Sequence, residues 1–206
     1  MSPWGSPLAK QLQGDGFVAS RTQIVCLHEG VGGRSIDPIF IRTLLKELDP
    51  AWIRPWKGSN IIRAVDCGGR GNLIAKMPGE LQTCIEMGAD TTLMVWADLD
   101  DDMDDGNQLR QKFHEEARQN GIADNDFDRV VFVFAKDRLE NWIEFLLTGS
   151  TDEAQEGCRV KDGKSVAAAA KKLAQICRGK LQGVQFPPSL NWSCQNWRRL
   201  VERMRA

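Results

Sequence analysis

The sequence predicts an α/β fold, with a mostly parallel four-stranded sheet flanked by helices and a helical annex at the C-terminal end. Short apolar runs rich in β-branched residues alternate with longer stretches whose apolar residues recur at helical spacing. Strands that alternate with helices in this way form parallel sheets covered on both faces. The chain of 206 residues is long enough for one such domain with a sizeable core.

The N-terminal part is rich in Gly, Pro and Ser, which predicts a loose arm over residues 1–20 ahead of a domain over 21–149. The apolar run TQIVCL, residues 22–27, predicts the first strand. The stretch SIDPIFIRTLLKEL, residues 35–48, has apolar residues at helical intervals and predicts a helix with Ser35 as a candidate N-cap.

The middle of the chain repeats this alternation. Residues 60–72, NIIRAVDCGGRGN, predict a short strand that runs into a glycine-rich turn. Residues 73–88 predict a helix that Pro78 kinks or breaks. The run TTLMVWA, residues 91–97, predicts the third strand, and a helix is expected over roughly 104–120.

The run RVVFVFA, residues 129–135, predicts the fourth strand, and residues 138–149 predict a helix closed by Gly149. Residues 150–206 predict a polar linker followed by the annex. Its two helices are expected over KSVAAAAKKLAQICRGKL and over SLNWSCQNWRRLVERMRA, whose apolar stripe includes Trp192 and Trp197 and must pack on the domain or on a partner.

The composition excludes several classes of protein. Lys and Arg total 27 against 28 Asp and Glu, so no global basic field indicates nucleic acid, although a local basic face is compatible with this balance. With no apolar stretch near the length of a membrane span and no signal-like start, we expect a cytoplasmic protein without membrane attachment. The six cysteines contain no C-x-x-C pair, which argues against a zinc site or a disulfide framework.

Familiar nucleotide and calcium motifs do not fit. The stretch GCRVKDGKS has five residues between its glycines instead of the four of a phosphate loop, and no strand precedes it. Neither GGRGN nor EGVGG fits the dinucleotide pattern G-x-G-x-x-G. An EF-hand loop that starts at Asp100 would have Asp105, not glycine, at its sixth position.

The stretch VWADLDDDMDDGN is dense in aspartate where the third strand ends. Such a run is typical of a solvated turn and helix start, but it is also typical of a divalent-cation site. Glu29 follows the first strand, while Asp98 and Asp100 follow the third. Because the carboxyl ends of parallel strands form the ligand crevice of an open sheet, these three carboxylates are expected to meet there and to hold Mg²⁺ or Mn²⁺.

Four stretches together resemble the Toprim domain, the metal-binding module of topoisomerases, primases, OLD-type nucleases and RecR-like proteins. They are LHEG, SIDPIFIRTLL, DCGGRGNLIAK and VWADLDDD, and the resemblance covers about residues 22–147. The stretch KDRLENWIEFLL also resembles the Glu-x-Trp helix of small stand-alone Toprim-like proteins of bacterial defence loci. The resemblance implies a Rossmann-like Toprim fold.

The resemblance also implies roles for single residues. Glu29 matches the family's glutamate, a candidate general base or metal ligand, and Gly30 matches the glycine after it. Asp98 and Asp100 match the Asp-x-Asp metal ligands, with Asp102 as a third candidate ligand.

Further residues have more than one interpretation. Asp37 matches an acidic residue of the family, but the loop VGGRSI before it is longer than the family pattern. Lys136 and Arg138 are candidates to neutralise a phosphate, with a solvated loop as the alternative. Glu140 is a candidate additional ligand or a residue that orients one. For His28 and His114 a structural or solvent role is expected, because no ligand partner is spaced to either.

These patterns predict a metal-dependent endonuclease that acts on DNA or RNA. The chain has no tyrosine, so the tyrosyl link of a topoisomerase is impossible, and a primase needs more machinery than this length offers. The resemblance further implies an antiviral defence effector that acts with an ATPase partner. Two alternatives stay open: a non-catalytic Toprim module that binds metal, nucleic acid or a protein, and a signalling domain whose acidic loop resembles a response-regulator phosphoacceptor site.

Overall fold

The computed structural model describes most of the chain. The described residues are 23–30, 35–48, 62–89, 91–100, 103, 105–178 and 183–205. The predicted N-terminal arm and three aspartates of the acidic run, Asp101, Asp102 and Asp104, lie outside them.

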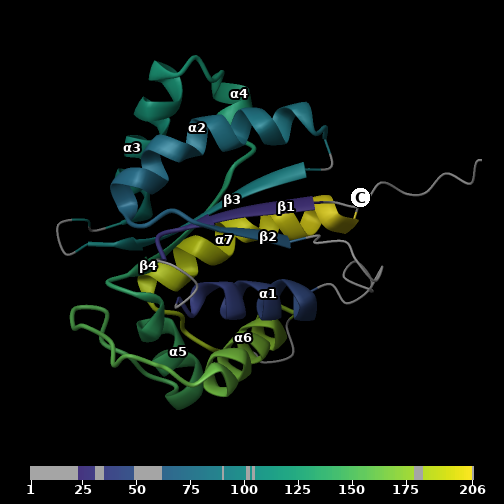
Figure 1. Ribbon diagram of the computed structural model, residues 1–206. Coiled ribbons are helices and arrows are strands. Elements are labelled where there is room, and N and C mark those ends of the chain that lie inside the picture. Colours follow the sequence, from purple (N-terminus) through teal and green to yellow (C-terminus); the bar gives the residue numbers. More distant parts are fainter. Residues whose placement is uncertain are drawn as a thin grey trace, which may run out of the picture.

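Four parallel strands form the central sheet, in the order β2-β1-β3-β4. They are β1 (Gln23–His28), β2 (Ile62–Asp66), β3 (Thr91–Leu99) and β4 (Val131–Lys136). The strands β3 and β4 are apolar and buried along nearly their whole length because helices cover both faces of the sheet (Figure 1). The predicted fold class is therefore confirmed. β3 is two residues longer than expected, so Asp98 belongs to the strand and does not follow it.

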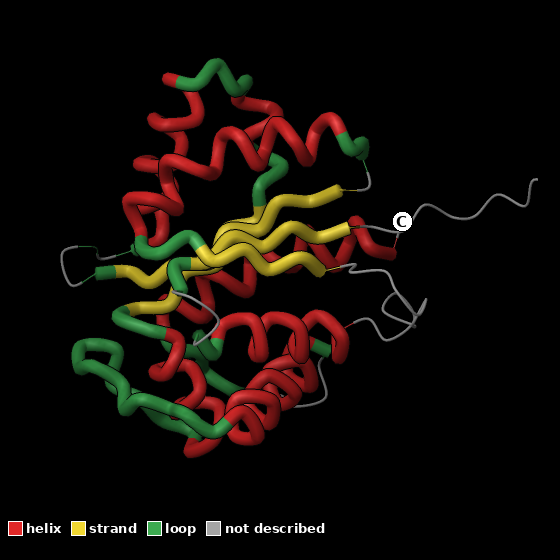
Figure 2. The backbone as a smooth tube through the Cα atoms, viewed as in Figure 1, coloured by secondary structure: helices red, strands yellow, loops and turns green. Residues whose placement is uncertain are grey.

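Helices pack in two layers on the sheet (Figures 1 and 2). One layer contains α1 (Asp37–Leu48), α5 (Leu139–Thr148) and α6 (Gly163–Cys177), and the other contains α2 (Arg70–Glu86), α3 (Gly106–Gln119) and the short α4 (Asp124–Phe127). Two separate apolar cores result, one on each side of the sheet. No helix among the described residues is long and apolar enough to cross a membrane.

Local sequence signals explain several helix ends. The Ser35 hydroxyl accepts a hydrogen bond of 3.2 Å from the backbone N–H of Asp37, as a capping residue does. Gly149 closes α5 in the left-handed conformation, as expected. The start of α2 differs from the expectation: the helix begins at Arg70, within the predicted turn, and continues past Pro78 without ending there. The four-residue α4 was not expected.

The C-terminal helices belong to the core. Helix α6 packs on α1 and α5, while α7 (Pro188–Arg205) packs along β4, the last strand of the sheet. The Ser193 hydroxyl of α7 accepts a hydrogen bond of 2.9 Å from the Phe134 N–H and donates one of 3.0 Å to the Phe134 carbonyl. Trp192 stacks on Phe134 and Trp197 is buried, as expected of the amphipathic stripe. The helix thereby covers a strand edge whose backbone groups need partners.

Candidate active site at the ends of β1 and β3

The strand order reverses between β1 and β3, because β2 lies on one side of β1 and β3 and β4 lie on the other. Ligands of open α/β sheets bind at this kind of switch point, outside the carboxyl ends of the strands. Glu29 directly follows β1, and Asp98 is the last residue but one of β3. The Glu29 carboxylate accepts a hydrogen bond of 3.2 Å from the Asp98 backbone N–H. The fold thus brings these two predicted residues together.

Gly30 keeps the turn after Glu29 compact. A Cβ atom at this position would lie 2.5 Å from the Ser35 Cβ and 2.8 Å from the His28 ring, closer than such contacts allow. The backbone of this turn also accepts hydrogen bonds from the N–H groups of Gly68 and Gly69, at 3.1 and 2.9 Å. These two bonds fix the glycine turn after β2 against Glu29, which sets where α2 begins.

Arg70, the first residue of α2, links the acidic residues of the two strands. Its Nε lies 3.2 Å from Glu29 Oε1, and its Nη2 donates to the Asp98 carbonyl at 2.6 Å and to Asp100 Oδ1 at 2.8 Å. Nη1 pairs with the second oxygen of Asp100, so this arginine–carboxylate contact is bidentate. Burial acts to lower the pKa of Arg70, but Asp100 and Glu29 outweigh it and raise that pKa. The sequence analysis missed this residue.

The Asp98 side chain faces the α1 and α5 side of the sheet, where it joins further carboxylates. Burial raises the pKa of Asp98 well above its ordinary value, and the charges of Asp37, Glu29 and Glu140 raise it further. Burial also raises the pKa values of Glu29 and Glu140. A cavity of about 760 Å³ contains all four carboxylates. Its lining also includes two cations from the loop before α6, Arg159 and Lys161.

Asp37 lies inside this site although the loop before it is long. Its carboxylate accepts a hydrogen bond of 2.6 Å from the Ser35 hydroxyl and lies 3.5 Å from Nδ1 of the buried His28. The other ring nitrogen of His28 lies 2.8 Å from Asp66 at the end of β2. His28 therefore lies between two carboxylates behind the site, in agreement with the structural role expected of it. His114 contacts Asp124 on the surface, at 2.8 Å.

Lys136 and Arg138 have local partners. The Lys136 ammonium donates 2.9 Å hydrogen bonds to the carbonyls of Asp100 and Met103, which attaches these two residues to the end of β4. Arg138 lies 3.1 Å from Asp137 and also pairs with Glu156. Arg70 therefore contacts the site carboxylates more directly than either predicted cation. The glycine-rich turn before Arg70 and the position of that turn at a strand end were the only sequence signals for it.

The geometry of the site bears on metal binding. Within the described part of the chain, no group of three or more His, Cys, Asp or Glu side chains is arranged to hold a metal ion. Arg70 stands between Glu29 and Asp100, which keeps these carboxylates in ion pairs with a protein cation. The donor chemistry nevertheless fits Mg²⁺ or Mn²⁺, because Asp98 is buried among carboxylates whose mutual repulsion a divalent cation relieves. Asp102 lies outside the described residues.

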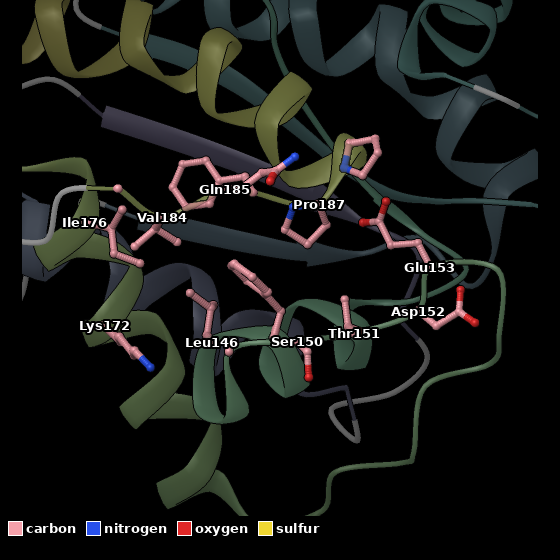
Figure 3. Close-up of a pocket in the computed structure, with 15 residues that line it drawn as sticks. Leu146, Ser150, Thr151, Asp152, Glu153, Lys172, Ile176, Val184, Gln185 and Pro187 are labelled. Atoms are coloured by element: carbon pink, nitrogen blue, oxygen red, sulfur yellow. The ribbon is translucent and has the colours of Figure 1, made fainter.

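Two other cavities lack this chemistry. One of about 640 Å³ lies between α5, α6 and the segment before α7, with a largely apolar lining (Figure 3). Lys172 and Glu153 lie at its opposite ends in that view, and Glu153 is already bonded to Ser189. The other, of about 450 Å³, lies beside Trp192 and Lys136. The carboxylates of the switch point line neither cavity.

Comparisons with protein-family models, with curated proteins and with solved structures each found no match. The resemblance to the Toprim domain therefore rests on the sequence motifs themselves.

Proposed function

We propose that the protein is a Mg²⁺- or Mn²⁺-dependent endonuclease of the Toprim type that hydrolyses phosphodiester bonds of DNA or RNA. The observation that carries this proposal is the convergence of Glu29 and Asp98, from two different strands, in one cavity at the switch point of a parallel sheet. Buried carboxylates with raised pKa values at such a position are typical of catalytic sites and are costly elsewhere.

The carboxylates proposed to hold the metal are Glu29, Asp98 and Asp100, with Asp102 as a further candidate. A bound divalent cation supplies a Lewis acid for the phosphoryl oxygens and lowers the pKa of coordinated water. The ion pairs of Arg70 with Glu29 and Asp100 offset part of the negative charge of this set in the metal-free protein. Metal binding through Asp100 therefore requires that Arg70 release it.

Glu29 is proposed either to accept a proton from the attacking water or to hold the metal. Its Oε1 is fixed by the Asp98 N–H and by Arg70, which orients the carboxylate at the edge of the cavity. In hydrolysis the water oxygen bonds to phosphorus, the bond from phosphorus to the leaving oxygen breaks, and the water proton passes to the base. The raised pKa of Glu29 makes it a stronger base than an ordinary glutamate. Arg70, which contacts Glu29 and Asp100, is the candidate cation for the charge that develops on the phosphate.

A cellular role is proposed from the resemblance alone. Small stand-alone Toprim-like proteins of defence loci imply that the endonuclease is an antiviral effector in the cytoplasm, restrained or delivered by an ATPase partner. Toxicity on expression that disappears in a Glu29→Gln variant, and that changes when the partner is co-expressed, is the expected behaviour.

One observation favours a second candidate function, a non-catalytic Toprim module. Arg70 pairs with two of the carboxylates, so the fold has a cation of its own at this position. A module that binds nucleic acid or a protein without cleaving anything needs no more than this.

The two candidates differ in a cleavage assay. Wild type, Glu29→Gln and Asp98→Ala are incubated with plasmid DNA and with total RNA, in Mg²⁺, Mn²⁺ or EDTA. Glu115→Gln, which removes an exposed carboxylate on α3, is the matched control. We expect metal-dependent cleavage by wild type and control and a loss of about a thousandfold or more in both site variants, which remain folded by circular dichroism. Cleavage that persists in both site variants contradicts the assignment, and no cleavage under any condition, even with a partner, favours the non-catalytic module.

A further inference from the structure

The loop between α5 and α6 lines one side of the cavity, although its sequence predicts only a linker. We call residues 155–161 of this loop the basic strap. The buried side chain of Asn141 donates hydrogen bonds of 3.2 Å to the Gln155 carbonyl and to the Lys136 carbonyl at the end of β4. Glu156 pairs with Arg138 at the start of α5. The strap is therefore attached to the strand end that borders the site.

Gly157 lets the strap approach α5 closely. A Cβ atom at this position would lie 2.3 Å from the Asn141 side-chain oxygen and 2.9 Å from the Asn141 backbone nitrogen, so no larger residue fits without movement. Figures 1 and 2 show the loop on the side of the molecule at which the strands end. This close approach to α5 fixes the position of the strap relative to the carboxyl ends of the strands.

Val160 fixes the orientation of the strap. Its side chain packs against the apolar core on the α1 side. Arg159 and Lys161 flank Val160 in the sequence, and both line the cavity.

Arg159 and Lys161 are exposed and line the same cavity as Glu29 and Asp98. Neither has an ion pair with another described residue, whereas Arg70, Lys136 and Arg138 are all engaged with carboxylates or carbonyls. A cleft with four carboxylates repels a polyanion at short range. Any nucleic acid that enters the cavity needs cations outside the metal site. Arg159 and Lys161 are cations of this kind in the cavity lining.

We propose that Arg159 and Lys161 form a phosphate subsite that binds the backbone of a nucleic-acid strand next to the phosphate at Glu29 and Asp98. This inference rests on the proposed function. The subsite takes phosphodiester groups without regard to base sequence, because contacts to phosphate carry none. It fixes the position of the strand relative to the carboxylates, so its loss affects binding and leaves the chemical step intact.

Binding in EDTA tests the subsite without the metal. A fluorescein-labelled 12-nucleotide DNA or RNA strand is titrated with wild type, with Arg159→Ala/Lys161→Ala and with Lys164→Ala/Lys171→Ala. The last variant removes the same charge from exposed positions of α6 outside the cavity. Loss of two phosphate contacts lowers the slope of log affinity against log salt by about 1.4 and weakens binding roughly tenfold at 200 mM salt. The control is expected to bind like wild type.

Cleavage of the same strand in Mn²⁺ provides the second readout. The double variant is expected to raise KM by roughly the same tenfold factor with kcat within about twofold of wild type, because the contact is made in both ground and transition states. The inference is overturned if the double variant binds like wild type, if the control loses as much affinity, or if wild type does not bind. Lost affinity in the double variant without cleavage by any protein supports the subsite and refutes the nuclease.

Discussion

The acidic cavity and the edge of β4 both bury polar groups, but the partners of these groups differ between the two regions. At the β4 edge, complementary partners meet. The Trp142 indole donates to the Ser189 hydroxyl at 2.7 Å, that hydroxyl donates to Glu153, and Ser193 satisfies both backbone groups of Phe134. Such fully paired networks stabilise one arrangement of the chain.

In the cavity, by contrast, like groups face one another. Asp98 is surrounded by Asp37, Glu29 and Glu140, and burial raises its pKa. Arg70 offsets part of this repulsion from the α2 side. An arrangement that disfavours its own charges lowers stability, and proteins keep such arrangements mainly at functional sites. The β4 edge therefore has the pairing of a structural region, whereas the cavity has the facing like charges that we attribute to the proposed site.

The largest expected effect comes from removing the covered edge altogether. Deleting residues 151–206 removes α6 and α7, whose buried residues include Leu173, Trp197 and Leu200, and exposes the β4 edge. We expect an insoluble or unfolded product, because both the core and the strand edge lose their cover. Circular dichroism and size-exclusion chromatography measure this. A truncated chain that stays folded, soluble and monomeric contradicts the role assigned to these helices.

A smaller loss is expected from one hydroxyl at the same edge. Ser193→Ala leaves the Phe134 N–H and carbonyl without their partner, which costs about 1–3 kcal/mol of the free energy of unfolding. Chemical denaturation measures that free energy. Ser150→Ala, at an exposed serine after α5, is the matched control and should change it by less than about 0.5 kcal/mol. Equal stability of the two variants would show that the edge does not depend on Ser193.

The sequence predicted the sheet and the meeting of Glu29 with Asp98 because both depend on regular features. Apolar runs and helical spacing mark the elements, and strand ends mark the crevice. It did not predict Arg70, since one arginine in a glycine turn forms no pattern and its partners lie 41 and 30 residues away. The contacts of Lys136 were not predicted either, because its partners are backbone carbonyls. The contacts of the strap with Asn141 and the core were not predicted because its polar composition is typical of a linker. Such contacts depend on tertiary packing that periodicity does not encode.

The smallest expected effect comes from replacing Asp98. This replacement should stabilise the protein, whereas Ser193→Ala should destabilise it. A carboxyl whose pKa is raised on folding makes the protein less stable as pH rises from the ordinary aspartate range through that raised pKa. In the metal-free protein at neutral pH, Asp98→Asn should therefore raise the free energy of unfolding by about 1 kcal/mol, a typical size for one substitution, or roughly 2–4 °C in Tm. The gain should vanish at low pH, where the wild-type carboxyl is protonated in both states.

Millimolar Mg²⁺ separates this stabilisation from a purely structural effect. A ligand that binds only the native state raises Tm, so wild type should gain stability with the metal, while Asp98→Asn and Asp98→Ala/Asp100→Ala should gain less or nothing. Thermal scans of the three proteins in EDTA and in Mg²⁺ give the stability of each protein without metal and the shift in Tm that Mg²⁺ causes. Asp98→Asn that is less stable than wild type in EDTA would place Asp98 with the paired groups of the β4 edge. An undiminished Mg²⁺ shift in the double variant would remove these aspartates from the metal site, because the carboxylates that bind the cation are the ones whose repulsion it relieves.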